Sequence, residues 1–143
     1  MARIKYLFFL AISLSILISC GKDDDNAGLA DSIVGLWKAE SIIVTLGDET
    51  FDELDEFPVS CPERPIVLIQ FNSSGSGDGE TECQGVVVDA YVFRYKLSNE
   101  GKELTIIESG DEYKFEVKKL TSSKLVLSSG ESAEKRIETW VRQ

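Results

Sequence analysis

The sequence predicts an all-β domain, an antiparallel up-and-down barrel of about eight strands. First, apolar and polar residues alternate along 91–97 and 113–117, which is the period of a strand with one buried face. Second, short segments rich in Gly, Ser, Asn and Asp separate such runs. Third, a helical period is weak and confined to residues 29–34 and 51–57.

Eight runs are the candidate strands, at residues 36–46, 65–71, 80–88, 91–97, 103–107, 113–117, 124–127 and 135–142. Turns are expected between them at residues 72–79, 98–101, 109–111, 121–123 and 128–131, with Asp78-Gly79 as a hairpin turn. Because these links are short and sequential, they favour a meander that closes on itself and so removes exposed sheet edges. A two-sheet sandwich with Greek-key connections is the alternative.

The composition excludes several classes of function. The 143 residues include 25 acidic and 15 basic side chains, for a formal net charge of −10. Nucleic acid is not an expected partner, because a phosphate-binding face needs clustered Lys and Arg. The absence of His excludes a Ser-His-Asp relay, a Cys-His nucleophile pair and an imidazole metal ligand. The 3 Cys are too few for a zinc site of four thiolates.

The N-terminus predicts a secretory signal peptide over residues 1–19. Arg3 and Lys5 precede an apolar run at residues 6–18. As a helix, about 13 residues would reach roughly 20 Å, which is short for a hydrocarbon layer of ~30 Å. A basic start followed by an apolar segment of this length is typical of an export signal. An uncleaved membrane anchor is the alternative.

The end of this segment, Leu17-Ile18-Ser19-Cys20, resembles the lipobox of bacterial lipoproteins. The resemblance implies that Cys20 receives a thioether-linked diacylglycerol, that the chain is cut before it, and that the new amine is acylated. A thiolate is the nucleophile that such an alkylation requires. Because stable anchoring takes two or more acyl chains, three would hold the protein on the membrane. A chance Cys at the end of an ordinary signal peptide is the alternative.

Residues 20–29 are expected to form a solvated tether, because this charged stretch with Gly and Asn cannot bury apolar surface. Lys22 followed by Asp23, Asp24 and Asp25 resembles the surface-export signal of Bacteroidota lipoproteins. The resemblance implies a lipid-anchored protein of the outer membrane, displayed at the cell surface. Anchoring in the periplasmic leaflet is the alternative.

If Cys20 carries lipid, Cys61 and Cys83 form an even pair in an exported, oxidising setting. We therefore expect a structural disulfide, which would stabilise the fold by roughly 3 kcal/mol through loop closure. Free buried thiols are the alternative. A redox-active pair is not expected, since the spacing is not CxxC and no basic cluster lies nearby to lower a thiol pKa.

A family resemblance follows from Gly35-Leu36-Trp37 at the start of the first strand, after a short helical turn. Together with the lipobox-like end, the Cys pair, Phe71-Asn72 before a Gly-rich segment and the late segment 113–125, it resembles the lipocalin-like domain of small Bacteroidota lipoproteins. The resemblance covers about residues 30–143. It implies that Trp37 closes the barrel floor and that Arg142 stacks over it, with Arg136 as second candidate.

Two segments could be mistaken for sites of chemistry. Six acids lie within residues 48–56, but their spacing matches no Ca²⁺ loop, and a solvated loop or a short amphipathic helix is expected. The Gly-rich stretch 72–82 lacks the Lys and the following helix of a phosphate-binding loop. No catalytic residue, metal or cofactor is predicted, although a pair of glycosidase-type carboxylates could exist unmarked in the sequence.

The barrel interior is the expected functional region, because eight strands enclose either packed side chains or one small ligand. The candidate lumen residues are the aromatic ones on predicted inward positions: Phe71, Tyr91, Phe93, Tyr95, Tyr113 and Phe115. The leading hypothesis is a non-enzymatic module that binds a small apolar or amphiphilic molecule, oriented by Tyr hydroxyls at the open end. The alternative is a barrel filled by these rings, whose outer surface binds a protein partner.

Overall fold

The structure is a computed structural model that describes residues 33–56, 61–131 and 133–143, and these residues form strands almost throughout. The strands are β1 (Gly35–Leu46), β2 (Glu49–Asp52), β3 (Ile66–Phe71), β4 (Ser76–Cys83), β5 (Val86–Ser98), β6 (Glu103–Glu108), β7 (Asp111–Leu120), β8 (Lys124–Glu131) and β9 (Glu134–Arg142), with a short 3₁₀ turn at Asn99–Gly101.

Eight of these strands form a closed antiparallel barrel. From β3 to β9 each strand pairs with the next one along the chain, and β1 pairs with both β3 and β9. The ninth strand, β2, forms a hairpin with the end of β1 and lies outside the closed ring. This arrangement confirms the predicted all-β, up-and-down barrel and rules out the sandwich with Greek-key connections.

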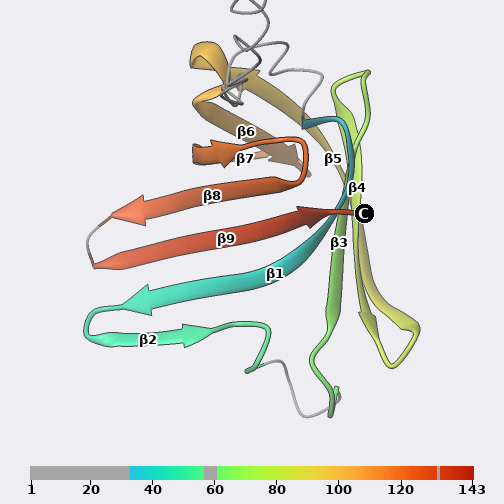
Figure 1. The fold of residues 1–143 in the computed structure, drawn as a ribbon, viewed down its shortest axis with the longest axis vertical. Coiled ribbons are helices and arrows are strands. Elements are labelled where there is room, and N and C mark those ends of the chain that lie inside the picture. The colour runs from blue at the N-terminus through green and yellow to red at the C-terminus, as the bar shows by residue number, and fades with distance from the viewer. Residues whose placement is uncertain (1–32, 57–60, 132) are drawn as a thin grey trace, which may run out of the picture.

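The barrel has a closed end and an open end. β1 pairs with β3 only from Gly35↔Phe71 to Lys38↔Leu68, and from Ile43 onward the same edge of β1 pairs with β2 instead. Figure 1 shows β1, β8 and β9 running away from β3 and β4 beyond this short contact. The turns at residues 72–75, 99–102 and 121–123 lie at the closed end, and those at 47–48, 84–85 and 109–110 lie at the open end.

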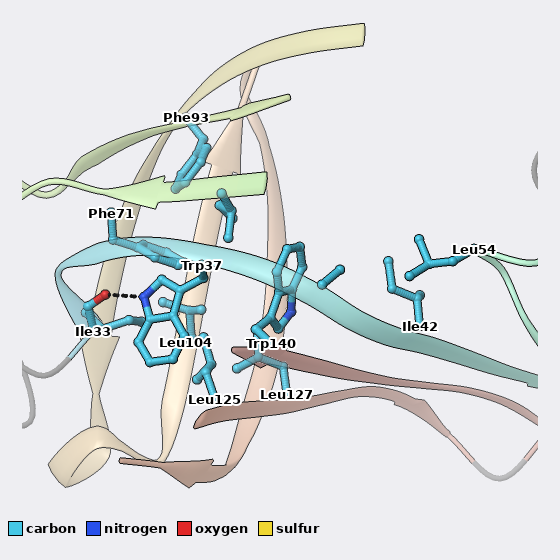
Figure 2. Close-up of a cluster of buried hydrophobic side chains, with 12 residues drawn as sticks. Ile33, Trp37, Ile42, Leu54, Phe71, Phe93, Leu104, Leu125, Leu127 and Trp140 are labelled. Carbon is cyan, nitrogen blue, oxygen red and sulfur yellow. Dashed lines mark hydrogen bonds between the residues drawn. The ribbon is translucent and has the colours of Figure 1, made fainter. Parts of the chain in front are cut away.

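The closed end is packed around Trp37. Its indole Nε1 donates a hydrogen bond of 2.8 Å to the carbonyl oxygen of Ile33, so the buried ring leaves no polar atom unsatisfied. Figure 2 shows this bond and the surrounding side chains. The largest side chains buried to less than 2% exposure include the members of this layer: Trp37, Phe71, Ile33, Leu104 and Leu125.

Arg142 covers Trp37 from the end of β9. Its guanidinium carbon lies 4.2 Å from the centroid of the Trp37 ring, a cation–π distance. Its Nη1 donates to the carbonyl of Val34, and its Nε donates to the carbonyl of Ser122, each at 2.6 Å. Gly35, at φ 139°, leaves room for this guanidinium, because a Cβ there would collide with it. Arg136, the second candidate, lies instead toward the open end.

The prediction of a turn over residues 72–79 is wrong in its second half. The turn ends at Gly75, and Gly77 and Gly79 lie inside β4, paired with β5. The reason is that Phe93 and Tyr91 fold across the backbone at these positions, where a Cβ would meet the Phe93 ring at Gly77 and the Tyr91 ring at Gly79. Asp78-Gly79 is therefore part of a strand.

The predicted strand 80–88 is two strands. Gln84 and Gly85, with φ of 52° and 78°, form the hairpin turn between β4 and β5. The turn was missed because residues 80–88 contain no Asn-Gly or Asp-Gly pair, and the run of three valines from Val86 reads as continuous strand.

The weak helical period over 51–57 does not correspond to a helix in its described part. Residues 49–52 are β2, and a turn follows through residue 55. Asp52 stabilises this turn: its Oδ1 accepts hydrogen bonds of 3.1 Å from the backbone N–H groups of Ile42 and Leu54. Burial opposes ionisation of Asp52, but these two bonds and the Arg64 guanidinium outweigh it and lower its pKa.

Cys61 and Cys83 are joined in a disulfide with a Cα–Cα distance of 5.6 Å, and they tie the segment before β3 to the end of β4. The predicted signal peptide over 1–19, Cys20, the tether over 20–29 and residues 29–32 of the predicted helical turn lie outside the described residues. Within the described ranges, no helix is long and apolar enough to cross a bilayer.

We predict that replacing both Cys61 and Cys83 by Ser lowers the free energy of unfolding by about 3 kcal/mol, because the unfolded chain regains the freedom of a loop of about 20 residues. Urea unfolding followed by circular dichroism measures the change. Reduced wild-type protein is the control and should unfold with the double variant. Equal midpoints for the variant and the oxidised wild type would contradict the prediction.

Candidate ligand-binding cavity

A cavity of about 580 Å³ occupies the open end of the barrel. Seven of the eight ring strands contribute to its lining, and β4, which lies between β3 and β5 in the ring, contributes none of the lining residues. The apolar and aromatic lining consists of Ile42, Val67, Ile69, Tyr91, Ile106, Tyr113, Phe115 and Trp140. The polar lining consists of Glu108, Glu112, Lys114, Ser129, Arg136 and Glu138. A mainly apolar concavity with a few polar groups is the ordinary composition of a small-molecule site.

The strand pleat explains which side chains face the cavity. Alternate residues of a strand point to the same face, so the inward face of β9 carries Arg136, Glu138 and Trp140 in succession. On β6 the same rule sets Glu108 two residues beyond Ile106 on the inward side. On β6 and β9 the inward face therefore becomes more polar toward the open end, while the apolar residues of these two strands lie deeper.

Trp140 separates the cavity from the packed floor. It is 4% exposed and belongs to the same buried cluster as Trp37. Figure 2 shows Trp140 on β9 between the Trp37 layer and Ile42. Ile42 and Ile69, both buried, complete the base of the cavity. The deepest contacts available to an occupant are therefore apolar and aromatic.

One wall of the cavity contains a buried carboxylate, that of Glu138. Glu138 is only 7% exposed, and its Oε2 accepts a hydrogen bond of 3.0 Å from Trp140 Nε1. Its Oε1 accepts one of 2.7 Å from Arg136 Nε, and Arg136 Nη1 also pairs with Glu53. Burial opposes the charge of Arg136, but the carboxylates of Glu138 and Glu53 outweigh it and raise the pKa of Arg136. The guanidinium is therefore already neutralised by two acids.

The phenol of Tyr91 also lies in this polar environment. Burial raises its pKa to about 12, and the negative charges of Glu138, Glu108 and Asp89 act in the same direction, while Arg136 opposes them. The phenol is therefore neutral at physiological pH and can donate a hydrogen bond to an occupant.

The six predicted lumen aromatics fall into two groups. Tyr91, Tyr113 and Phe115 line the cavity, with Tyr113 at its rim and 49% exposed. Phe71, Phe93 and Tyr95 do not line it, because they pack on one another toward the closed end. The Phe71 ring lies edge-on to Phe93 at 5.5 Å and to Tyr95 at 4.9 Å. Tyr95 also donates a hydrogen bond of 2.7 Å to the carbonyl of Asn72.

Sequence reasoning missed the polar half of the cavity. The sequence predicts Arg136 only as a second candidate for the floor, and it singles out neither Glu138 nor Trp140. The available signal was the alternation within residues 135–142, which sets Arg136, Glu138 and Trp140 on one face of the last strand. An acidic and a basic residue that share a strand face with a Trp indicate a polar pair inside the barrel.

Three of the six acids in the stretch 48–56 form ion pairs. Asp52 and Asp55 pair with Arg64, and Glu53 pairs with Arg136. Within the part of the chain that the structure describes, no group of three or more Cys, Asp and Glu could hold a metal ion.

Two solved structures share this architecture. The first is the NMR structure of a protein from Bacteroides thetaiotaomicron VPI-5482, with a TM-score of 0.51 and 18% identity over 84% of this chain and 98% of that one. The second is the crystal structure of a lipocalin-like protein from Bacteroides uniformis ATCC 8492, with a TM-score of 0.50 and 18% identity over 75% of this chain and 96% of that one.

The chain has a lipocalin-like fold. No protein-family model matches the sequence. No curated protein matches it either. In a lipocalin-like barrel of eight strands, the interior is wide enough for packed side chains or for one small ligand. This lipocalin-like barrel does both, since its closed end is packed and its open end is hollow.

We predict that Tyr91→Phe removes the phenol that ionises near pH 12 from an absorbance titration. Because burial penalises the phenolate only in the folded state, the phenol leaves stability unchanged below about pH 10. The free energy of unfolding then falls by on the order of 3 kcal/mol as pH rises from about 10 to about 12. Circular dichroism at neutral pH checks that the variant folds. An unchanged titration would contradict the assignment.

Proposed function

We propose that the protein binds one small, largely apolar molecule in the open-end cavity. The observation that carries the proposal is the cavity itself, whose volume of about 580 Å³ lies within the range of about 300–1,000 Å³ typical of small-molecule sites. Its base of Ile42, Ile69 and Trp140 suits an apolar group. Its rim carries Tyr91 and Glu108, which suit a polar end.

The proposal assigns binding and no catalysis to the cavity. Arg136 and Glu138 are held by each other, and each has a second partner besides, in Glu53 and in Trp140 respectively. Such a pair contributes to the shape and polarity of the wall. The chain also lacks the His that serves most often as general base.

We further propose that lipid on Cys20 anchors this barrel to the outer membrane, at the cell surface. The proposal rests on the lipobox-like Leu17-Ile18-Ser19-Cys20 and on the acidic tether that follows it. Two or more acyl chains on one residue give stable membrane attachment.

We predict that the full chain, reconstituted in phosphatidylcholine nanodiscs, binds one molecule of the neutral dye N-phenyl-1-naphthylamine above the signal of empty nanodiscs. Ile106→Trp fills the cavity and should weaken dye binding at least tenfold. Thr105→Trp is the matched control, since it adds the same ring to the outward face of β6 and should bind as the wild type does.

Two outcomes would contradict this proposal. If the wild type gives no saturable signal above empty nanodiscs, the barrel does not bind such molecules, and the protein-partner alternative gains support. If the Ile106→Trp and Thr105→Trp variants bind the dye equally well, the dye occupies some other place than the cavity.

We predict that mass spectrometry of the natively expressed protein finds residues 1–19 removed and three acyl chains on Cys20. The Cys20→Ala variant should lack this mass and leave the membrane fraction, because the anchor is lost. Cys61→Ala, which keeps Cys20, should stay with the membrane. An unmodified Cys20 thiol behind an intact leader would overturn the anchoring proposal. Protease treatment of whole cells distinguishes the outer face from the periplasmic leaflet.

A further inference from the structure

The charges that face the cavity are mainly negative. Glu138 on β9 and Glu108 on β6 point inward, and Asp89 shares the inward face of β5 with Tyr91. All three carboxylates act on the phenol of Tyr91, so they lie around the same space. Arg136 is the cation that acts on it.

This cation is not available to a ligand. Arg136 donates through Nε to Glu138 and through Nη1 to Glu53, so two carboxylates already share its charge. Lys114 also contributes to the lining, but its side chain belongs to the outward face of β7, since Phe115 next to it points inward. A ligand carboxylate would therefore find no uncommitted cation on the inward faces of the described strands.

Glu108 is the carboxylate best placed to meet a ligand. It lines the cavity two residues beyond Ile106, near the open end of β6. It forms no ion pair with any residue of the described ranges. An unpaired carboxylate attracts a cation and repels an anion, and the effect is stronger in a partly dry cavity than in water.

The aromatic residues at the same level add to this preference. Tyr91 and Tyr113 line the cavity toward the open end, with Phe115 deeper, opposite Leu104, and the faces of aromatic rings attract ammonium groups. The Tyr91 phenol is neutral and offers a hydrogen bond to an uncharged polar end as well.

We infer that the cavity selects amphiphiles whose polar end is positive or uncharged, and discriminates against those that end in a carboxylate. The apolar tail would lie against Ile42, Ile69 and Trp140, and the polar end would meet Glu108 at the rim. This inference rests on the proposed function and names the chemical class of its ligand.

Competition for the bound dye tests the inference. The full chain in phosphatidylcholine nanodiscs, loaded with N-phenyl-1-naphthylamine, is titrated at neutral pH with decyltrimethylammonium, decanol and decanoate. These probes share a ten-carbon chain and differ in the charge of the polar end. We expect decyltrimethylammonium and decanol to displace the dye at concentrations at least tenfold lower than decanoate, after the partitioning of each probe into empty nanodiscs is subtracted.

A pair of variants on β6 assigns the selectivity to its source. Glu108→Gln removes the inward charge and should reduce the preference for decyltrimethylammonium over decanoate at least threefold. Glu103→Gln removes a charge from the outward face of the same strand and should keep the wild-type preference. The ratio between two probes on one variant is unaffected by a general loss of stability.

Each outcome has a distinct meaning. Equal displacement by all three probes, or displacement by decanoate at the lowest concentration, overturns the inference and leaves the binding function in place. A Glu108→Gln variant with the wild-type ratio also overturns it. If no dye binds to the wild type in the first place, the proposed function itself has failed.

Discussion

The double pairing of β1 is the constraint on which the rest of the structure depends. One edge of β1 pairs along its length with β9, the last strand, and this closes the ring. The other edge pairs with β3 over four residues and, further along β1, with β2. The first pairing makes a barrel, and the brevity of the second leaves one end of that barrel wide.

The packed layer around Trp37 stabilises the short pairing between β1 and β3. Trp37 and Lys38 are the last residues of β1 that face β3, and Trp37 lies beneath Arg142 at the end of β9. A side chain of the last strand thus contacts the first strand at the closed end, where β1 pairs with β3. The hydrogen bonds of Arg142 to Val34 and Ser122 bring two further segments to the same point.

Local patterns were sufficient to predict the fold class. Strict alternation over 91–97 and 113–117 specified strands, and short links specified a meander, as observed. Glycines misled the prediction where they serve packing: Gly77 and Gly79 receive the rings of Phe93 and Tyr91, and this is a contact between neighbouring strands that composition cannot reveal. A chain-local pattern also cannot show that β2 would take over the edge of β1.

The candidate site was harder to predict than the fold. Alternation places an aromatic residue on the inward face but says nothing about its depth, and depth decides whether Phe71 fills the floor or Tyr91 lines the cavity. Glu138 accepts hydrogen bonds from Trp140 and Arg136 on its own strand. Arg136 in turn pairs with Glu53, which lies 83 residues away in sequence. Such a network exists only once the barrel has closed.

The divergence of β1 from β3 has a consequence for how the interior exchanges with its surroundings. The cavity lies where β1 and β3 have already separated, so a ligand of the proposed kind would enter without breaking a backbone hydrogen bond between these strands. Tyr113 at the rim is 49% exposed, and the rotation of exposed side chains takes picoseconds to nanoseconds. Ligand exchange at the open end would therefore not require unfolding of the packed closed end.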